Sequence, residues 1–313
     1  MSVGKYSLSV FVQCAVVACL YGQQAPQISH YMFNTQMYNP ANAGFTNSIV
    51  ASAIHRQQWY GMGEAPQTTL VSVDAPLRVI QSGVGLNIFN DQIGDYNNTT
   101  IQLNYNYQLP FLDGTLGIGV QGGLNSMGLN ANFKPREQGD PVVQSKEGEE
   151  ISLFLFDVGA GFFYTVTNQY EIGISMGHIN QPTSDHLNYK KRRTLNLSGN
   201  YNFSLGMFPK IDFVPSTLVK TDFSAMQVDL SLIGLYDKKF WGGLTYRMGD
   251  AIVLLAGMHL QQFPLQVGVA YDLATSMMFR ASKIGGSFEV FARYSFNLSV
   301  DRVPQSYKNS RFL

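Results

Sequence analysis

The sequence predicts an all-β fold, a transmembrane outer-membrane β-barrel of about 14 antiparallel strands. Apolar and polar residues alternate along many segments of about ten residues, as in strands with one face in lipid and the other toward a polar lumen. Behind the leader, no stretch of about 18 residues is continuously apolar, so a helical membrane protein is excluded. Aromatic residues make up 13% of the chain, a high share for a soluble domain.

The first residues are typical of a secretory signal peptide. Lys5 precedes an apolar core, from Leu8 to Leu20, that is too short to span a membrane. We expect residues 1–22 to be this signal, with cleavage before Gln23. An alternative stays open, because the tetrapeptide that ends at Cys19 also fits a loose lipoprotein box, which would make that cysteine a lipidated N-terminus.

Composition excludes several functional classes. The formal net charge is zero and only 13% of residues are charged, so the chain has no basic field for a nucleic-acid partner. The two cysteines, Cys14 and Cys19, lie in the leader. The exported body is therefore expected to have no disulfide, no thiolate metal site and no cysteine nucleophile. The mean hydropathy of the chain, −0.04, suits a soluble β-sandwich as well as a membrane barrel. The periodicity of the sequence therefore has to distinguish the two folds.

The segment 99–110 shows the periodicity most clearly. Its apolar side carries Ile101, Leu103, Tyr105, Tyr107 and Leu109, and its polar side carries Gln102, Asn104, Asn106 and Gln108. In the segment 285–298 only Phe291 intrudes on the polar side. Aromatic residues also gather near expected strand ends, where we expect membrane-interface girdles: Trp59, Tyr60, Tyr107, Tyr164, Tyr236 and Trp241. These features favour a membrane barrel over a sandwich.

Turn signals divide the barrel, residues 48–298, into an even number of strands. The expected spans are 48–58, 67–78, 83–91, 99–110, 114–127, 151–166, 170–181, 193–205, 213–223, 227–237, 240–248, 251–262, 264–274 and 285–298. The long polar connection 130–150 is expected to be extracellular, and an even strand count to leave both termini periplasmic. Residues 299–313 would form a periplasmic tail.

The segment 23–47 precedes the barrel, and we expect it to be plug-like or peripheral, within the lumen or at its periplasmic mouth. Its aromatic residues require burial and its amides can meet polar lumen groups. The candidate plug or partner-binding residues are Tyr31, Phe33, Asn34, Tyr38, Asn39 and Pro40.

The sharpest charge cluster precedes the span that begins at residue 193. It consists of Lys190, Lys191, Arg192 and Arg193. We interpret it as a basic patch at the exterior rim, which is solvated or lies beside anionic lipopolysaccharide. Docking of an acidic protein surface is the alternative.

Enzymatic signals are weak. Residues 117–122 spell GxGxxG, but no helix follows, so these glycines are expected to let the strand curve or let an inner segment approach the wall. The five histidines lack metal-ligand spacing. Ser184, Asp185 and His186 are adjacent in sequence, which does not make a catalytic triad. We expect no catalytic residue, metal or cofactor.

Residues 27–44 read QISHYMFNTQMYNPANAG, a long specific word that no generic strand or helix rule produces. The word closely resembles the opening of mature PorP/SprF-family proteins, outer-membrane components of the type IX secretion system. The resemblance continues in the family's order through Trp59, Gly61, Pro66, Thr68, Asp74, Pro76, Gly83, Gly85, Asp91, Gly94, Pro215, Ser216, Lys220, Asp229, residues 240–243, Tyr246, Arg247, Tyr271, Asp272, Gly286, Glu289, Tyr294 and Phe296. Two departures are Phe288, where the family often has His, and the extension from Ser299 to Leu313.

The resemblance implies a non-enzymatic role in type IX secretion. Such a protein would assist export or surface attachment of large proteins such as adhesins, by binding their C-terminal domain or periplasmic secretion components. A barrel of about 14 strands admits a short segment but not a folded domain, so the secreted protein should not pass folded through it. A passive porin or hydrophobic-solute transporter is the alternative, because the fold alone does not separate these functions.

Overall fold

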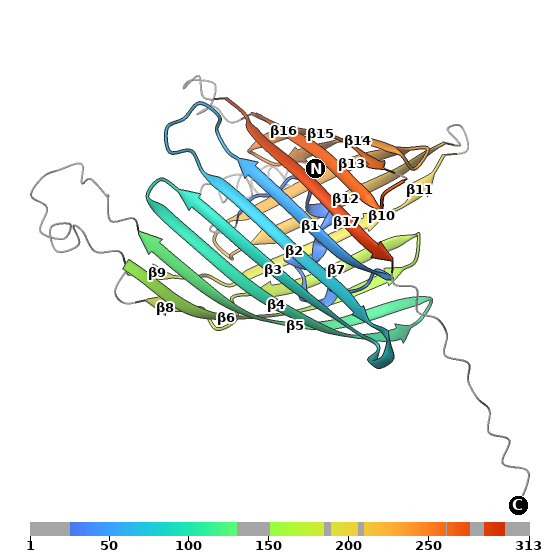
Figure 1. Cartoon of the computed structure of the whole chain (residues 1–313), viewed down its shortest axis with the longest axis horizontal. Helices are drawn as coiled ribbons and strands as arrows, with labels where there is room; N and C mark the ends of the chain where they lie inside the picture. The colour runs from blue at the N-terminus through green and yellow to red at the C-terminus, as the bar shows by residue number, and fades with distance from the viewer. Residues whose placement is uncertain are drawn as a thin grey trace, which may run out of the picture.

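The computed structural model describes residues 26–129, 151–184, 189–205, 210–260, 262–275 and 285–297. They form a closed antiparallel β-barrel whose tilted strands wrap around a short N-terminal segment (Figure 1). The expected signal peptide, the loop 130–150 and the tail 299–313 lie outside the described residues.

The wall contains 14 strands, with one additional short strand, β11, at its edge. The wall strands are β1 (Ser48–Gln57), β2 (Gln67–Leu77), β3 (Ser82–Ile93), β4 (Tyr96–Phe111), β5 (Gly114–Leu129), β6 (Ile151–Val166), β7 (Tyr170–Gly177), β10 (Thr194–Tyr201), β12 (Ile211–Thr221), β13 (Met226–Tyr236), β14 (Phe240–Arg247), β15 (Ala251–Leu260), β16 (Leu265–Ala274) and β17 (Ser287–Asn297). Strand β11 is Phe203–Ser204, and β8 (Thr183–Ser184) pairs with β9 (Tyr189–Lys190) as a separate hairpin.

Each wall strand corresponds to one of the spans expected from sequence, so the predicted fold class is confirmed. The largest difference concerns β7, which ends at Gly177 because the chain turns at His178, whose φ is 56°. The expected span 193–205 is divided at Asn202 into β10 and β11.

Closure follows from two pairings. Strand β1 pairs with β17, with Ser48 opposite Asn297, and β10 pairs with β12. Each of the 14 wall strands thus has a partner on both sides, and the barrel satisfies its backbone groups as a membrane-spanning sheet requires. Among the described residues, no helix is long and apolar enough to cross a membrane.

We call the two mouths of the barrel the loop end and the turn end. The loop end carries the connections 130–150 and 178–193, whereas the turn end carries tight turns such as Leu112–Asp113. Strand β1 begins and β17 ends at the turn end. Since outer-membrane barrels carry their longer loops outside, we expect the loop end to face the cell exterior.

The burial pattern is inverted relative to a soluble protein. On β4, Leu103 is 64% exposed on the outer surface, while Asn104 and Asn106 are buried in the lumen. Apolar residues on the outside and amides on the inside suit a barrel in lipid.

The prediction that Trp241 belongs to an interface girdle was wrong. Trp241 is only 4% exposed and lies inside the barrel, because it shares the inward phase of β14 with Thr245 and Arg247. Phe291, the apolar intruder of β17, is also buried inside. Wall glycines at positions 257 and 268 make room for the indole, since a Cβ at either position would overlap the Trp241 ring.

An arginine at the middle of the outer surface should impair folding. Leu103→Arg places a charge in the apolar band, which we expect to cost roughly 2–4 kcal/mol. The matched control is Leu112→Arg, because Leu112 is 83% exposed in a turn and its replacement stays in water. Heat-modifiable migration on gels measures the folded fraction. Equal losses from both variants would contradict the membrane assignment of this surface.

Candidate functional site

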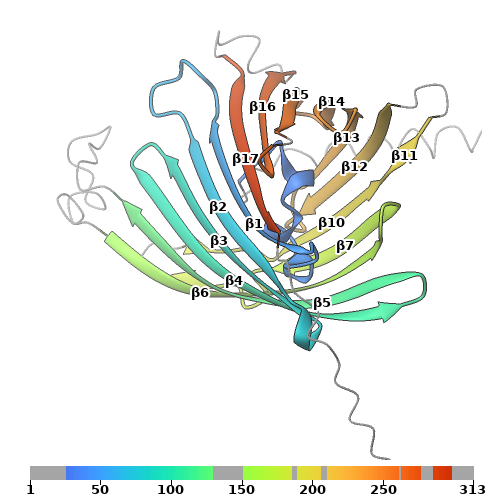
Figure 2. The ribbon, with the colours of Figure 1, turned by 45° about the vertical axis from the view of Figure 1, so that its right-hand side comes forward.

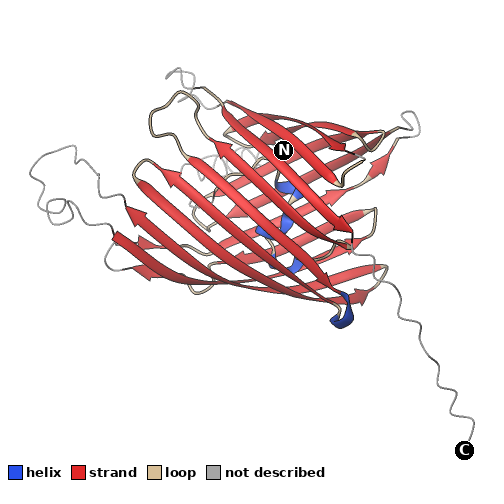
Figure 3. Ribbon diagram, in the orientation of Figure 1, coloured by secondary structure: helices blue, strands red, loops and turns tan. Residues whose placement is uncertain are grey.

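The lumen segment, which we define as residues 26–45, lies inside the barrel (Figure 2). It contains three short 3-10 helices, η1 (Tyr31–Phe33), η2 (Thr35–Met37) and η3 (Pro40–Asn42). A fourth, η4 (Arg78–Ile80), lies in the turn between β2 and β3 (Figure 3). Asn39 begins η3 as its N-cap, and its side chain accepts a hydrogen bond from the N–H of Ala41 at 3.0 Å. Pro40 follows at the first helical position, where proline is tolerated best.

A buried carboxylate on the wall holds the beginning of the lumen segment. Glu289 of β17 accepts hydrogen bonds from the backbone N–H groups of Ser29, at 2.8 Å, and His30, at 2.9 Å. Its Oε1 also lies 2.6 Å from Nδ1 of His30. The wall therefore binds both the backbone and the side chain of the segment at this point.

Two buried arginines and Asp272 surround the Ser29 hydroxyl. Oδ2 of Asp272 lies 2.6 Å from Nη2 of Arg56 and 2.7 Å from Nη1 of Arg247. The Ser29 hydroxyl donates to Oδ1 of Asp272 at 3.0 Å and accepts from Nη1 of Arg56 at 2.9 Å. Charges removed from water require such partners, because each unpaired ion costs several kcal/mol.

We call this set of contacting groups the charge network. Arg247 extends it to Asp229, with Nε at 3.4 Å from Oδ2, and Arg56 links it to Glu289 at 3.3 Å. Its members are Ser29, His30, Arg56, Asp229, Arg247, Asp272 and Glu289. The wall charges come from five strands, β1, β13, β14, β16 and β17, so the network fastens the lumen segment and cross-links this half of the barrel.

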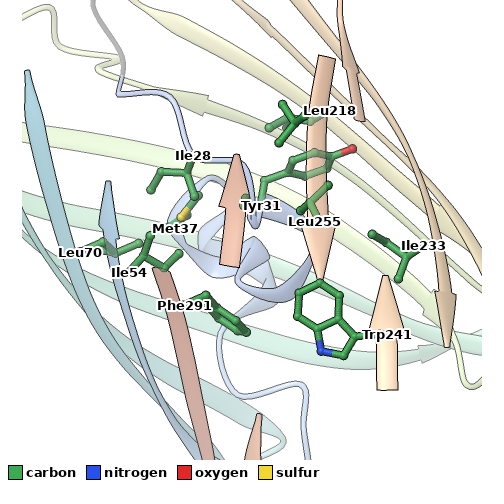
Figure 4. Packing of buried hydrophobic residues seen from close by; sticks show 12 residues of the cluster. Ile28, Tyr31, Met37, Ile54, Leu70, Leu218, Ile233, Trp241, Leu255 and Phe291 are labelled. Carbon is green, nitrogen blue, oxygen red and sulfur yellow. The ribbon is translucent and has the colours of Figure 1, made fainter. Parts of the chain in front are cut away.

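An apolar cluster lies next to the charge network (Figure 4). Ile28, Tyr31 and Met37 of the lumen segment pack there against wall residues such as Trp241 and Phe291. Phe33 packs on the rings of Trp241 and Phe291, with centroids 4.7 Å and 5.4 Å away, and the His30 ring stacks on Phe291 at 5.1 Å. These aromatic contacts fill the lumen where Trp241 points inward.

The second half of the lumen segment is held by amide and hydroxyl groups. Nδ2 of Asn34 donates to Oγ of Ser72 at 2.7 Å, and Nδ2 of Asn39 donates to the carbonyl oxygen of Phe162 at 2.9 Å. From the wall, Nδ2 of Asn106 donates to the carbonyl oxygens of Ala41 and Ala43 at 2.7 and 2.6 Å. Polar side chains of the wall thus bind the backbone of the segment directly.

Glycines on the wall make this close approach possible. A Cβ at Gly119 would overlap the backbone of Ala41, and a Cβ at Gly83 would overlap the carbonyl of Ala43. Gly119 belongs to the GxGxxG word. These glycines were expected either to let the strand curve or to let an inner segment approach the wall. At Gly119 the structure shows the close approach.

The lumen segment crosses the barrel from the loop end to the turn end. Nζ of Lys220, near the loop end of β12, donates to the carbonyl oxygen of Pro26 at 3.3 Å, whereas Gly44 contacts Asp74 near the turn end of β2 at 3.0 Å. The expectation that both termini are periplasmic concerns chain ends outside the described residues and stays a prediction. Pro26, the first described residue, lies near the opposite mouth from Asn297. An even strand count fixes where the barrel begins and ends but not the course of a segment that returns through its lumen.

The six candidate plug residues all lie in the lumen segment. Tyr31, Asn34, Asn39 and Pro40 are buried, and Phe33 and Tyr38 are partly buried. Sequence reasoning missed Ser29 and His30, together with the role of the buried wall charges. The available signal was a set of isolated charged residues at inward positions, each within three residues of the loop end of its strand.

The side chains of the basic cluster, residues 190–193, lie in two different environments. Lys191 is buried and turns toward Asp157, with Nζ 3.9 Å from Oδ2, and Nδ1 of His178 lies 2.5 Å from the same oxygen. Burial lowers the pKa of the Lys191 ammonium, and the Asp157 carboxylate partly offsets this effect. By contrast, Lys190, Arg192 and Arg193 line an open pocket of about 610 Å³. No group of three or more His, Cys, Asp or Glu side chains in the described part of the chain could hold a metal ion.

Removing one charge from the charge network should destabilise the whole barrel. Glu289→Gln leaves His30 without a carboxylate partner and Arg56 with Asp272 alone, and we expect a loss of roughly 3 kcal/mol. Glu64→Gln, at an exposed position in the connection after β1, is the matched control. The temperature at which each variant loses its fast-migrating folded form reports stability. A Glu289→Gln barrel as stable as the control would show that the network does not hold the fold.

Comparisons with known structures confirm the barrel. The chain is similar to the CymD monoaromatic hydrocarbon channel, with 12% identity, a TM-score of 0.52 and coverage of 88% of this chain and 95% of that one. It is also similar to the toluene transporter TbuX of Ralstonia pickettii, with 11% identity, a TM-score of 0.51 and coverage of 84% and 92%. At such identities the likeness concerns the fold alone. No curated protein matches the chain.

The family assignment comes from the sequence as a whole. Residues 20–294 match the family described as type IX secretion system membrane protein PorP/SprF. This range includes the lumen segment and all the strands except the last three residues of β17. The chain therefore belongs to the PorP/SprF family of type IX secretion system membrane proteins and is a β-barrel of the outer membrane.

Proposed function

We propose that this protein is a non-enzymatic component of type IX secretion that assists export or surface attachment of large secreted proteins such as adhesins. It would do so by binding their C-terminal domain or by contacting periplasmic secretion components. Family membership supports the secretion role. The observation that carries the mechanism is the lumen segment, whose contacts with the wall occupy the bore from one mouth to the other.

A filled bore favours a binding platform over a conduit. Between the lumen segment and strands β7, β10 and β12, a cavity provides only about 10 Å³ for water. This volume is close to the minimum for a single water molecule. This cavity therefore admits no polypeptide while the segment is in place, and we expect soluble protein partners to bind at the mouths of the barrel.

Solute transport is the alternative function. The similar structures named above are a hydrocarbon channel and a toluene transporter, and they favour this function only through a shared fold. A transporter would need the lumen segment to open a path, whereas a platform needs it to stay bound. The two functions therefore respond differently when the segment is loosened.

Loosening the lumen segment should reduce secretion. Phe33→Ala with Tyr38→Ala removes the ring that packs on Trp241 and Phe291 and the ring that lies 5.6 Å from Nζ of Lys220. Aromatic anchors of this kind dominate binding energetics. We expect a folded barrel in the outer membrane with reduced surface display of the partner protein.

The control for this variant is Tyr107→Ala with Phe111→Ala, because both side chains lie on the outer surface. Surface display, conductance in planar bilayers and co-purification from gently solubilised membranes are measured on the same preparations. Raised conductance with normal surface display would contradict the secretion function and support solute transport.

A further inference from the structure

An open pocket at the loop end combines positive charge with apolar surface. We call it the rim pocket, and its principal residues are Met176, Lys190, Arg192, Arg193, Asp222 and Phe223. It lies between the connection from β7 to β10 and the turn from β12 to β13. Those two connections adjoin because β10 pairs with both β7 and β12. Its volume of about 610 Å³ lies within the range of sites for organic ligands.

The rim pocket faces the outside of the barrel rather than the lumen. On β7, Ser175 points inward and donates to the carbonyl oxygen of Tyr38 at 2.6 Å, so its neighbour Met176 points outward. Met176 continues the outer row of Ile172 and Ile174, both exposed. Phe223 is 65% exposed in the turn after β12. The pocket therefore begins where the apolar outer surface ends, at the level of lipid headgroups.

The charges of the rim pocket favour an anion. Among the described residues that line it, Lys190, Arg192 and Arg193 outnumber one carboxylate, that of Asp222. Oδ1 of Asp222 accepts hydrogen bonds from the N–H groups of Ser224, at 2.9 Å, and Ala225, at 2.7 Å, so this carboxylate fixes the turn. The positive charge is left in excess at the pocket.

Local hydrogen bonds orient the two arginines. Arg192 donates to Oγ of Ser224, and Nε of Arg193 donates to the carbonyl oxygen of Ile179 at 3.0 Å. Guanidinium groups held in this way are suited to phosphate, which they bind through charge-assisted hydrogen bonds. Lys191 does not share this role, because its ammonium is directed to Asp157.

We propose that the rim pocket binds the phosphorylated headgroup of an outer-leaflet glycolipid, the lipid A portion of lipopolysaccharide. The phosphate contacts Lys190 and Arg193, and the first carbons of the acyl chains contact Met176 and Phe223. An acidic protein segment would match the charges but leave these two apolar side chains without a matching group. A lipid of the outer leaflet can contact both the charged and the apolar side chains of the pocket without leaving the membrane.

Lipid binding to the purified barrel tests the proposal. Diphosphorylated lipid A is added to the protein in detergent, and native mass spectrometry measures its dissociation constant for the parent and for Lys190→Glu with Arg193→Glu. We expect the variant to bind about tenfold more weakly or worse, as loss of charge-assisted hydrogen bonds implies. Lys238→Glu with Lys239→Glu, at the turn end, is the matched control and should bind like the parent. All three proteins must show the same heat-modifiable migration.

Further arms of the experiment identify the source of the phosphate. Removing the phosphates from lipid A should weaken its binding to the parent protein. The loss should match the loss that the charge-reversed variant shows with diphosphorylated lipid A. Inorganic phosphate at millimolar concentration should leave lipid A bound. Equal affinity of parent and variant, equal affinity for the dephosphorylated lipid, or displacement by inorganic phosphate would each overturn the proposal. A variant that keeps lipid A but loses cross-links to an acidic protein would assign the pocket to protein docking instead.

Discussion

The charge network between the lumen segment and the wall is the interaction on which the rest of the structure depends. Arg56, Arg247, Asp229, Asp272 and Glu289 point into the barrel, where charges without partners would be costly. Ser29 and His30 supply hydrogen-bonding groups that the wall alone does not provide. Wall and segment therefore stabilise each other.

This dependence shapes what the protein can do. The lumen segment is continuous with β1, so it meets the inner wall at a high effective concentration. The charge network holds it near the loop end, and wall amides and glycines hold it toward the turn end. A secretion component built in this way presents two mouths and a lipid-facing surface to its partners while its bore stays occupied. The rim pocket places a second binding surface on the outside, away from the segment.

Much of the fold could be predicted because strand alternation depends on local sequence. The span 99–110 was recognisable since each position from 101 to 109 carries either an outward apolar or aromatic group or an inward amide. Trp241 was assigned wrongly because an aromatic residue near a strand end suits both a membrane interface and a filled lumen, and only the register of β14 decides between them. Charges such as Arg56 and Glu289 come together only when β1 and β17, which are distant in sequence, pair to close the barrel. The split of the basic cluster likewise depends on Asp157, which lies far from Lys191 in the sequence.

Cross-linking between the lumen segment and the wall tests the central claim most directly. The exported body is expected to contain no cysteine, so an introduced pair reports a single contact. Asn34→Cys is combined either with Ser72→Cys, whose hydroxyl lies 2.7 Å from the Asn34 amide, or with Val73→Cys, whose side chain is 38% exposed on the outer surface. Mass spectrometry of the folded protein from oxidised outer membranes should find a disulfide with position 72 and none with position 73. Absence of the link to position 72, or equal linking to both positions, would contradict a segment held inside the barrel.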